Sequence, residues 1–98
     1  MSDLELTPSS PGEILLEEFL EPLNISQNQL AKDLRIPPSR VNDIIKGRRS
    51  ISADTAIRLG LFFGMSPEFW LKAQVDYDLR LVKKNLETIK GEVHPHAA

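Results

Sequence analysis

The segment from Ser26 to Ile51 constrains the fold of this 98-residue chain more than any other stretch. It reads as two short helices joined by a tight turn over residues 35–37, and a basic loop follows the second helix. Small and apolar residues recur where two crossing helices must touch: Leu30, Ala31, Leu34, Ile36, Val41, Ile44 and Ile45. The second helix keeps polar side chains on its outward side. An apolar back with a polar edge is what a helix-turn-helix needs to lay a helix in the DNA major groove, so DNA binding is predicted.

The outward side chains of the second helix are of the types that read base edges. Arg40 can donate two hydrogen bonds to guanine, Asn42 can pair bidentately with adenine, and Asp43 can accept from cytosine N4. Ser39, near the helix start, can bond to a base or to a phosphate. On an arbitrary helix this mixture is only a solvated face, but the two-helix spacing favours base contact. Asp43 is the weakest member, because an acid near phosphates is unfavourable unless it reads a base or orients Arg40.

A second set of residues is predicted to hold the DNA backbone. Gln27 lies at the start of the first of the two helices, where its amide and free backbone N–H groups can bind a phosphate oxygen. The alternative for Gln27 is an exposed glutamine in a capping turn. The basic loop after the second helix suits non-specific phosphate contact. The predicted phosphate contacts are Gln27, Lys46, Arg48, Arg49 and Ser50.

The net charge of −2 conceals a segregation of charge along the chain. Residues 1–31 carry six acids and no Lys or Arg, whereas residues 32–58 carry seven basic residues against three acids. The remaining residues balance. Positive charge is therefore concentrated where the DNA footprint is predicted. The acidic N-terminal part is either a solvated face or a face that meets a basic partner.

Serines, prolines and glycines mark the expected helix boundaries. Ser10 and Pro11 predict the start of the first helix, and Pro22 is expected to end it because the ring cannot continue the helical ladder. Its inward residues are expected to be Ile14, Leu15, Phe19 and Leu20. Further caps are predicted at Ser26, Ser52 and Ser66, and glycine stops at Gly47 and Gly64. Arg35 stands in the turn at a place that often takes positive φ, which costs a non-glycine residue about 1 kcal/mol.

The last two helices are expected over residues 53–63 and from 67 through 90. In the former, one apolar stripe is predicted to comprise Ala56, Ile57, Leu59, Phe62 and Phe63. The latter has apolar residues on several sides, too many for one small core, so a dimer interface is predicted there. Its expected residues are Trp70, Tyr77 and Leu81.

The chain is thus predicted to be an all-α protein with one small domain. Residues 1–10 are expected to form an N-terminal arm and residues 89–98 a flexible tail. Residues 11–88 are expected to form the helix-turn-helix domain that binds DNA and dimerises. Five helices, the last of them long, are expected in that domain.

Several other classes of protein are disfavoured by the sequence. The chain has no cysteine, so it has no disulfide, thiolate metal site or thiol nucleophile. It shows neither a membrane-length apolar run nor a signal-peptide pattern, and a cytoplasmic protein without membrane contact is expected. His94 and His96 have no predicted third ligand, which favours a flexible tail over a metal site. The glutamates of the first helix are expected on an exposed face without an apolar pocket, and the sequence has no Gly-rich phosphate loop, so no enzyme, metal or cofactor is predicted.

The order of these motifs resembles the HigA-type antitoxins of the Xre-like helix-turn-helix group. The resemblance runs from Pro11 to Leu79 and is most specific in PGEILLEEFLEPL, IPPSRVNDIIKGRRSISADTAIRL and SPEFWLKAQVDYDL. One departure is Ser10, where the family often has His before Pro-Gly. The resemblance implies a five-helix, lambda-repressor-like fold and a homodimer that represses its own operon by binding operator DNA. It also implies a cognate HigB-type toxin, a small basic mRNA endonuclease that the antitoxin neutralises.

Two alternatives stand beside an antitoxin that is also an autorepressor. One is a stand-alone, phage-like transcriptional repressor without a toxin, which the absence of a neighbouring reading frame for a small basic protein would favour. The other is an interaction module that neutralises a protein partner while its helix-turn-helix only folds. The sequence does not give the operator, the half-site spacing or the surface that meets the toxin.

Overall fold

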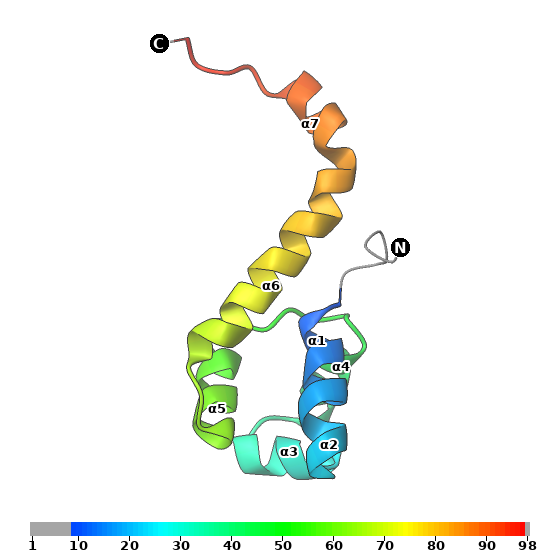
Figure 1. The fold of residues 1–98 in the computed structure, drawn as a ribbon, viewed down its shortest axis with the longest axis vertical. Coiled ribbons are helices and arrows are strands. Elements are labelled where there is room, and N and C mark those ends of the chain that lie inside the picture. The colour runs from blue at the N-terminus through cyan, green and yellow to red at the C-terminus, as the bar shows by residue number, and fades with distance from the viewer. Residues whose placement is uncertain (1–8, 98) are drawn as a thin grey trace.

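The fold begins and ends with long helices that enclose the predicted helix-turn-helix (Figure 1). The computed structural model describes residues 9–97, so most of the predicted N-terminal arm, residues 1–8, lies outside the described part. The first helix comprises α1 (Pro11–Ile14), the turn η2 (Leu15–Leu20) and α2 (Glu21–Leu23). The middle helices are α3 (Gln27–Leu34), α4 (Pro38–Ile45) and α5 (Ala53–Phe63). The last comprises α6 (Pro67–Val82), η3 (Lys83–Asn85) and α7 (Leu86–Glu92), and the predicted all-α fold with a long C-terminal helix is confirmed.

Serine side chains start four of these helices, as the sequence predicted. Each accepts a hydrogen bond from a backbone N–H of the first turn that would otherwise have no partner; the caps are Ser10, Ser26, Ser52 and Ser66. Ser10 and Glu13 form a reciprocal capping box, with both hydrogen bonds 3.1 Å long. The Ser66 hydroxyl also donates to the carboxylate of Glu68 and holds the pKa of that group below its ordinary value.

The prediction that Pro22 ends the first helix is wrong. The helix continues through Pro22 to Leu23, and it ends where Asn24 takes a left-handed conformation with φ 58°. The residues before the proline form a π-helical turn, in which the N–H of Glu21 donates to the carbonyl of Leu16, five residues back. This wider turn changes the hydrogen-bond register just ahead of the proline, so the missing N–H of Pro22 and its ring are accommodated.

One hydrophobic core joins all five helices. The residues predicted to face inward from the helix-turn-helix are all buried, as are Leu15 and Leu20 of the first helix. Ala56 and Leu59 of α5 complete the core. Ile57 was expected to widen the α5 stripe, but it is 52% exposed, and that prediction is wrong.

Trp70 lies at the centre of this core and not at a dimer interface. Its side chain has no exposed surface in the single chain. Its ring centroid lies 5.0 Å from that of Phe19 and 5.0 Å from that of Phe69. The apolar face of the first helix covers it, so Trp70 has no area left for a partner and its assignment to the dimer interface is corrected. Tyr77 is half-buried and Leu81 is 36% exposed, so both remain accessible.

The first helix rests directly on α4 through a glycine. A Cβ atom added to Gly12 would lie 1.9 Å from the carbonyl oxygen of Ile44 and 2.7 Å from the Cα of Ile45. No side chain fits in that space, so the backbones of α1 and α4 touch here. The position of α4 within the domain is therefore fixed from behind by α1. This role of Gly12 was not predicted from the sequence.

The C-terminal helix leaves the globular part and carries the tail with it (Figure 1). Its helical residues run to Glu92, so the predicted domain boundary at 88 falls inside α7 and only residues 93–97 of the described tail lack helical structure. Exposed apolar side chains continue along it: Val75, Leu79, Leu81, Val82 and Leu86. No helix within residues 9–97 is long and apolar enough to cross a membrane.

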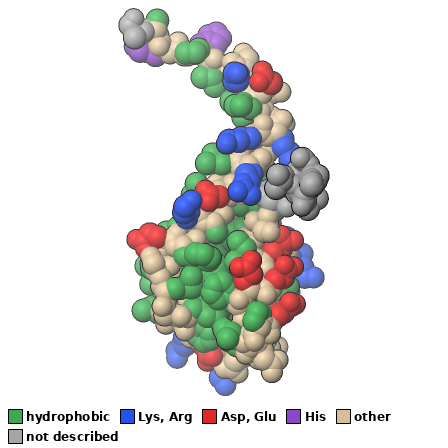
Figure 2. Space-filling model, viewed as in Figure 1, with side chains coloured by type: hydrophobic (Ala, Val, Ile, Leu, Met, Phe, Trp, Pro, Cys, Tyr) green, Lys and Arg blue, Asp and Glu red, His purple; other side chains and the backbone are tan. Residues whose placement is uncertain are grey.

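Apolar and acidic side chains share one face of the globular part (Figure 2). Apolar atoms gather over its middle, and acidic side chains lie beside them along the first helix. The α4 helix lies behind the first helix in this view. The face that is predicted to meet DNA is therefore a different one.

Candidate nucleic-acid interface

The turn between α3 and α4 has the geometry that the sequence predicted. Arg35 takes a left-handed conformation with φ 61°, and Pro37 is extended before α4 begins. The N–H of Ile36 donates to the carbonyl of Ala31 across a distance of 3.1 Å, which closes the C-terminus of α3. Ile36 is buried beside α3 and α4, so the turn is packed on the core. The two helices are therefore held as a rigid pair.

The predicted reading and phosphate residues share a hydrogen-bonded network on the outer edge of this pair. The amide nitrogen of Asn42 donates to the side-chain oxygen of Gln27 at 3.2 Å. The guanidinium of Arg48 donates to the side-chain oxygen of Asn42 at 3.3 Å and contacts the carboxylate of Asp43 at 3.2 Å. The network joins the start of α3, the middle of α4 and the basic loop. The fold therefore brings together four residues that were predicted from separate segments: Gln27, Asn42, Asp43 and Arg48.

The network changes the interpretation of Asp43. Asp43 was expected to read a base or to orient Arg40, but its carboxylate bonds to Arg48. The Arg48 side chain is 60% exposed and that of Asp43 is 36% exposed, and an ion pair this open to solvent contributes about 1 kcal/mol or less. Arg48 can therefore leave Asp43 for a phosphate at little cost. In the absence of DNA, the pairing holds the Arg48 side chain on the edge where a phosphate would lie.

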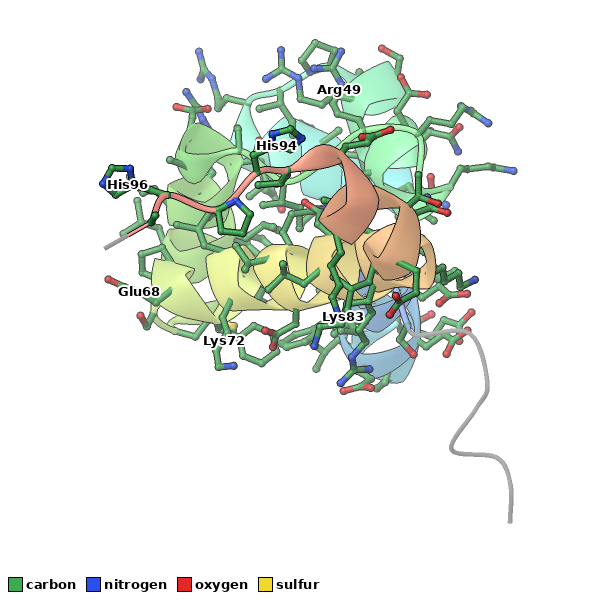
Figure 3. All side chains as sticks on the ribbon, turned by 90° about the horizontal axis from the view of Figure 1, so that it is seen from above. Arg49, Glu68, Lys72, Lys83, His94 and His96 are labelled. Atoms are coloured by element: carbon green, nitrogen blue, oxygen red, sulfur yellow. The ribbon has the colours of Figure 1, made fainter. Side chains whose placement is uncertain are left out.

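The remaining predicted residues line the same edge. Ser39 and Lys46 are exposed on α4, Arg40 is half-buried, and Arg49 and Ser50 are exposed in the loop. Figure 3 views the molecule from above and shows Arg49 on the side opposite to Lys72. Arg49 of the loop and Lys72 of α6 therefore belong to different faces of the molecule. The outer edge of α4 and the loop thus carry four basic residues, Arg40, Lys46, Arg48 and Arg49, together with Asp43.

The basic loop is held in place by α6. Gly47 takes φ 80°, and the N–H groups of Arg48 and Arg49 both donate to the carbonyl of Asp43. Farther along the loop, the N–H of Ile51 donates to the side-chain oxygen of Gln74 on α6 at 2.9 Å. The other end of the Gln74 amide donates to Asp78, also at 2.9 Å. Sequence reasoning missed Gln74, because no local pattern links residues that are 23 positions apart.

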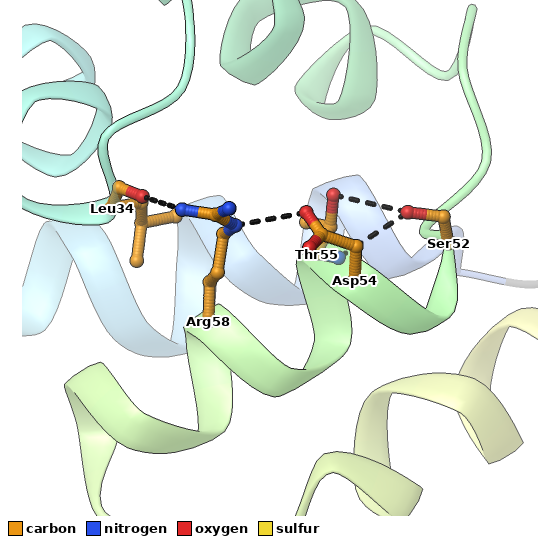
Figure 4. Close-up of polar contacts among 5 residues, drawn as sticks. All are labelled: Leu34, Ser52, Asp54, Thr55 and Arg58. Carbon is orange, nitrogen blue, oxygen red and sulfur yellow. Dashed lines mark hydrogen bonds and ion pairs between the residues drawn. The ribbon is translucent and has the colours of Figure 1, made fainter.

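A second residue that sequence reasoning missed fixes the other end of α3 (Figure 4). Arg58 of α5 donates to the last carbonyl of α3, that of Leu34, at 2.9 Å. Its Nε donates to Asp54 one turn earlier in α5 at 2.8 Å. Arg58 had been counted with the DNA-facing charge. The structure instead gives it the role of capping α3.

The side chains show no second kind of site at this edge. No group of three or more His, Asp or Glu side chains that could hold a metal ion occurs within residues 9–97. His94 and His96 are exposed in the segment after α7 (Figure 3). What the edge offers is amide, hydroxyl and guanidinium hydrogen bonding beside positive charge, which is the chemistry of base edges and phosphates.

Comparison with known proteins agrees with this geometry. A family model described as helix-turn-helix matches residues 16–70. The structure of an addiction module antidote protein of the HigA family from Coxiella burnetii has a TM-score of 0.82 and is 51% identical, covering 93% of this chain and 100% of that one. The chain belongs to the HigA family of helix-turn-helix proteins. This confirms the resemblance and the prediction that the chain is not an enzyme.

Two other relatives extend the comparison. The antitoxin HigA of Pseudomonas aeruginosa, solved with the higBA promoter, has a TM-score of 0.83 and is 43% identical, covering 92% of this chain and 99% of that chain. Virulence-associated protein I of Dichelobacter nodosus is 44% identical over 85 residues, 87% of this chain and 79% of that protein. The similarity therefore includes the whole helix-turn-helix and much of α6.

Proposed function

We propose that this chain is the antitoxin of a type II toxin–antitoxin pair. It acts in the cytoplasm, binds the operator of its own operon as a homodimer, and neutralises a HigB-type mRNA endonuclease toxin. The observation that carries the DNA-binding part is the network of Gln27, Asn42 and Arg48 on the exposed edge of the helix-turn-helix. The P. aeruginosa HigA solved with its promoter is 43% identical to this chain over most of its length, which supports the same role here.

In this proposal, α4 enters the major groove and the loop follows the phosphates. Arg40 and Asn42 read base edges from the centre of α4, with Ser39 and Asp43 beside them. Gln27, at the start of α3, holds both Asn42 and a phosphate oxygen, because the N-terminus of a helix favours an anion. Lys46, Arg48, Arg49 and Ser50 contribute contacts that are independent of sequence.

A homodimer would place two copies of α4 on a two-fold operator. The outer surface of α6 supplies an apolar interface for it, since Val75, Leu79 and Val82 are each at least half exposed. Tyr77 and Leu81 stay in the proposed interface beside them. A single chain of net charge −2 with one reading helix would bind weakly, and pairing makes the second half-site contact intramolecular.

Replacing Arg40 and Asn42 together by alanine should abolish most operator recognition. Each bidentate base contact contributes about 1–3 kcal/mol of discrimination, so the affinity for the operator should fall at least about tenfold. Binding to unrelated duplex of the same length should fall much less. Fluorescence anisotropy with both duplexes measures the two affinities. Lys84→Ala with Asn85→Ala removes one positive charge and one asparagine from η3 and serves as control. Equal losses of affinity on both duplexes would contradict base reading.

Arg48→Ala should weaken binding to every sequence. Loss of one phosphate contact should make the plot of log affinity against log salt less steep by about one unit, on operator and unrelated duplex alike. The measurement is a salt titration of binding to both duplexes. Lys90→Ala removes one charge from α7 and should leave the slope unchanged. A loss confined to the operator would instead assign Arg48 to base reading or to the support of Asn42.

Co-expression with the adjacent gene tests the toxin-directed part of the proposal. The antitoxin should rescue growth and co-purify with a small basic protein. An operator-binding chain that neither rescues growth nor co-purifies with that protein is a stand-alone repressor. A chain that rescues growth but binds no DNA at low salt is an interaction module.

A further inference from the structure

Aromatic side chains from three helices meet on the face opposite the DNA-binding edge. Phe19 of the first helix lies 4.9 Å from Phe63 of α5 and 6.1 Å from Phe69 of α6, between ring centroids. Phe19 and Phe63 are half-buried, and Phe69 is 42% exposed. Leu23, one turn after Phe19, is 57% exposed. The core therefore opens to the surface here as a patch of large apolar side chains (Figure 2).

Acidic side chains lie beside this patch along the first helix (Figure 2). Glu17 and Glu21 are exposed one turn apart, and Glu18 lies between them in sequence. The first helix has no Lys or Arg, and within residues 9–97 no ion pair involves these glutamates. The basic residue closest in sequence to Phe69 on α6 is Lys72, which is paired with Asp76 at 3.0 Å. We call the surface formed by Phe19, Leu23, Phe63, Phe69, Glu17 and Glu21 the aromatic–acidic face.

A hollow extends the aromatic–acidic face between α1 and α6. It has a volume of about 310 Å³; its apolar walls include Ile14, Phe69 and Ala73, and its charged walls are Lys72, Asp76 and Arg80. A partner can therefore place an apolar side chain against Phe69, while its cationic side chains belong beside the first helix, away from Lys72 and Arg80.

The aromatic–acidic face and the DNA-binding edge are on opposite sides of the domain. Figure 3, the view from above, shows Arg49 and Lys72 on opposite sides of the domain. Lys72 lies on the side that faces the reader in Figure 2, and Arg49 lies on the far side. The charge of the two surfaces is also opposite, since the loop carries Arg48 and Arg49 while the first helix carries only acids. A protein partner on the aromatic–acidic face would leave α4 and the loop free to hold DNA.

We propose that the aromatic–acidic face is the docking surface for a small basic protein, with Phe69 and Leu23 as its apolar anchors and Glu17 and Glu21 as its acidic border. This inference rests on the proposed function, in which the basic protein is the toxin. Stable interfaces combine a desolvated apolar centre with a polar rim, and aromatic anchors contribute most of their affinity. The glutamates select a cationic partner and speed its approach, and they repel a second acidic surface.

Charge reversal on the aromatic–acidic face tests the docking surface without disturbing the core. The variant Glu17→Lys with Glu21→Lys should bind the basic protein encoded by the adjacent gene at least about tenfold more weakly, because like charges would then face each other. Its operator affinity should be unchanged or slightly higher. Isothermal titration calorimetry with the purified partner, at low and moderate salt, measures the loss and its salt dependence. Leu23→Ser, at an exposed position, should weaken binding at both salt concentrations by a similar factor.

A matched control makes the result specific to the aromatic–acidic face. Glu87→Lys with Glu92→Lys introduces the same change of charge on α7 and should leave partner affinity within about twofold. If both pairs of substitutions weakened partner binding equally, net charge alone would explain the effect and the proposed docking surface would be wrong. Full affinity in the Glu17 and Glu21 variant would also overturn it, while the antitoxin function would stand. A wild-type chain that does not bind the basic protein would instead refute the proposed function, and the docking inference with it.

Discussion

Gly12→Ala should destabilise this protein by about 3 kcal/mol, the upper end of the usual cost of overpacking. The added methyl would lie 1.9 Å from the carbonyl oxygen of Ile44, which belongs to the backbone and cannot rotate away like a side chain. Either α1 must withdraw from α4 or the end of α4 must distort. Both changes move the residues that face DNA, so operator affinity should fall together with stability.

Urea unfolding followed by the fluorescence of the single tryptophan measures this loss. Gly91→Ala is the natural control, because no atom lies within 4 Å of the added methyl and alanine favours a helix by about 1 kcal/mol over glycine. That variant should keep wild-type stability or exceed it slightly. A Gly12→Ala protein with an unchanged urea midpoint and unchanged operator affinity would show that α1 and α4 are not held in contact.

Trp70→Ala should be the most damaging single substitution, with a loss of about 3–5 kcal/mol. Trp70 is fully buried and contacts rings from the first helix, α5 and the start of α6. Removing it leaves a cavity where these helices meet. Since domains of this size are stable by only about 5–15 kcal/mol, much of the folded population should be lost. Thermal unfolding followed by circular dichroism measures the change.

The variant Trp70→Phe distinguishes the contribution of packing to stability from that of the indole N–H. The buried Nε1 has no hydrogen-bond partner among the described residues, so phenylalanine gives up volume but no hydrogen bond. Its loss of stability should be clearly smaller than that of alanine. If the two variants were equally unstable, the indole N–H would have a partner that matters. If instead Trp70→Ala kept its stability but became monomeric, Trp70 would belong to a dimer interface after all.

Much of the local structure could be predicted because short-range chemistry determines it. The four serine caps, the positive φ of Arg35 and the inward positions of α3 and α4 each depend on residues within one helical turn. The edge that carries Asn42 and Arg48 was predicted for the same reason, because helical spacing decides which side chains face outward. The reading residues themselves remain a prediction.

The omissions came from contacts between distant residues. Gly12 and Ile44, Arg58 and Leu34, and Ile51 and Gln74 meet only when the chain has folded. Pro22 was misjudged because a π-helical turn ahead of it changed the hydrogen-bond register. Trp70 was assigned to a partner because the amphipathic pattern of α6 does not distinguish the side that meets α5 from the side that meets a second chain.

The hydrogen bond between Ile51 and Gln74 bears on the spacing between operator half-sites that a dimer would accept. It ties the basic loop to α6, which carries the proposed dimer contacts, so loop, α4 and pairing helix would move as one body. In a dimer joined through α6, the distance between the two α4 helices would therefore be fixed. One additional base pair between the half-sites lengthens the DNA by about 3.4 Å and rotates one site against the other. A dimer without a flexible joint would therefore bind that operator weakly, although every base that it reads is still present.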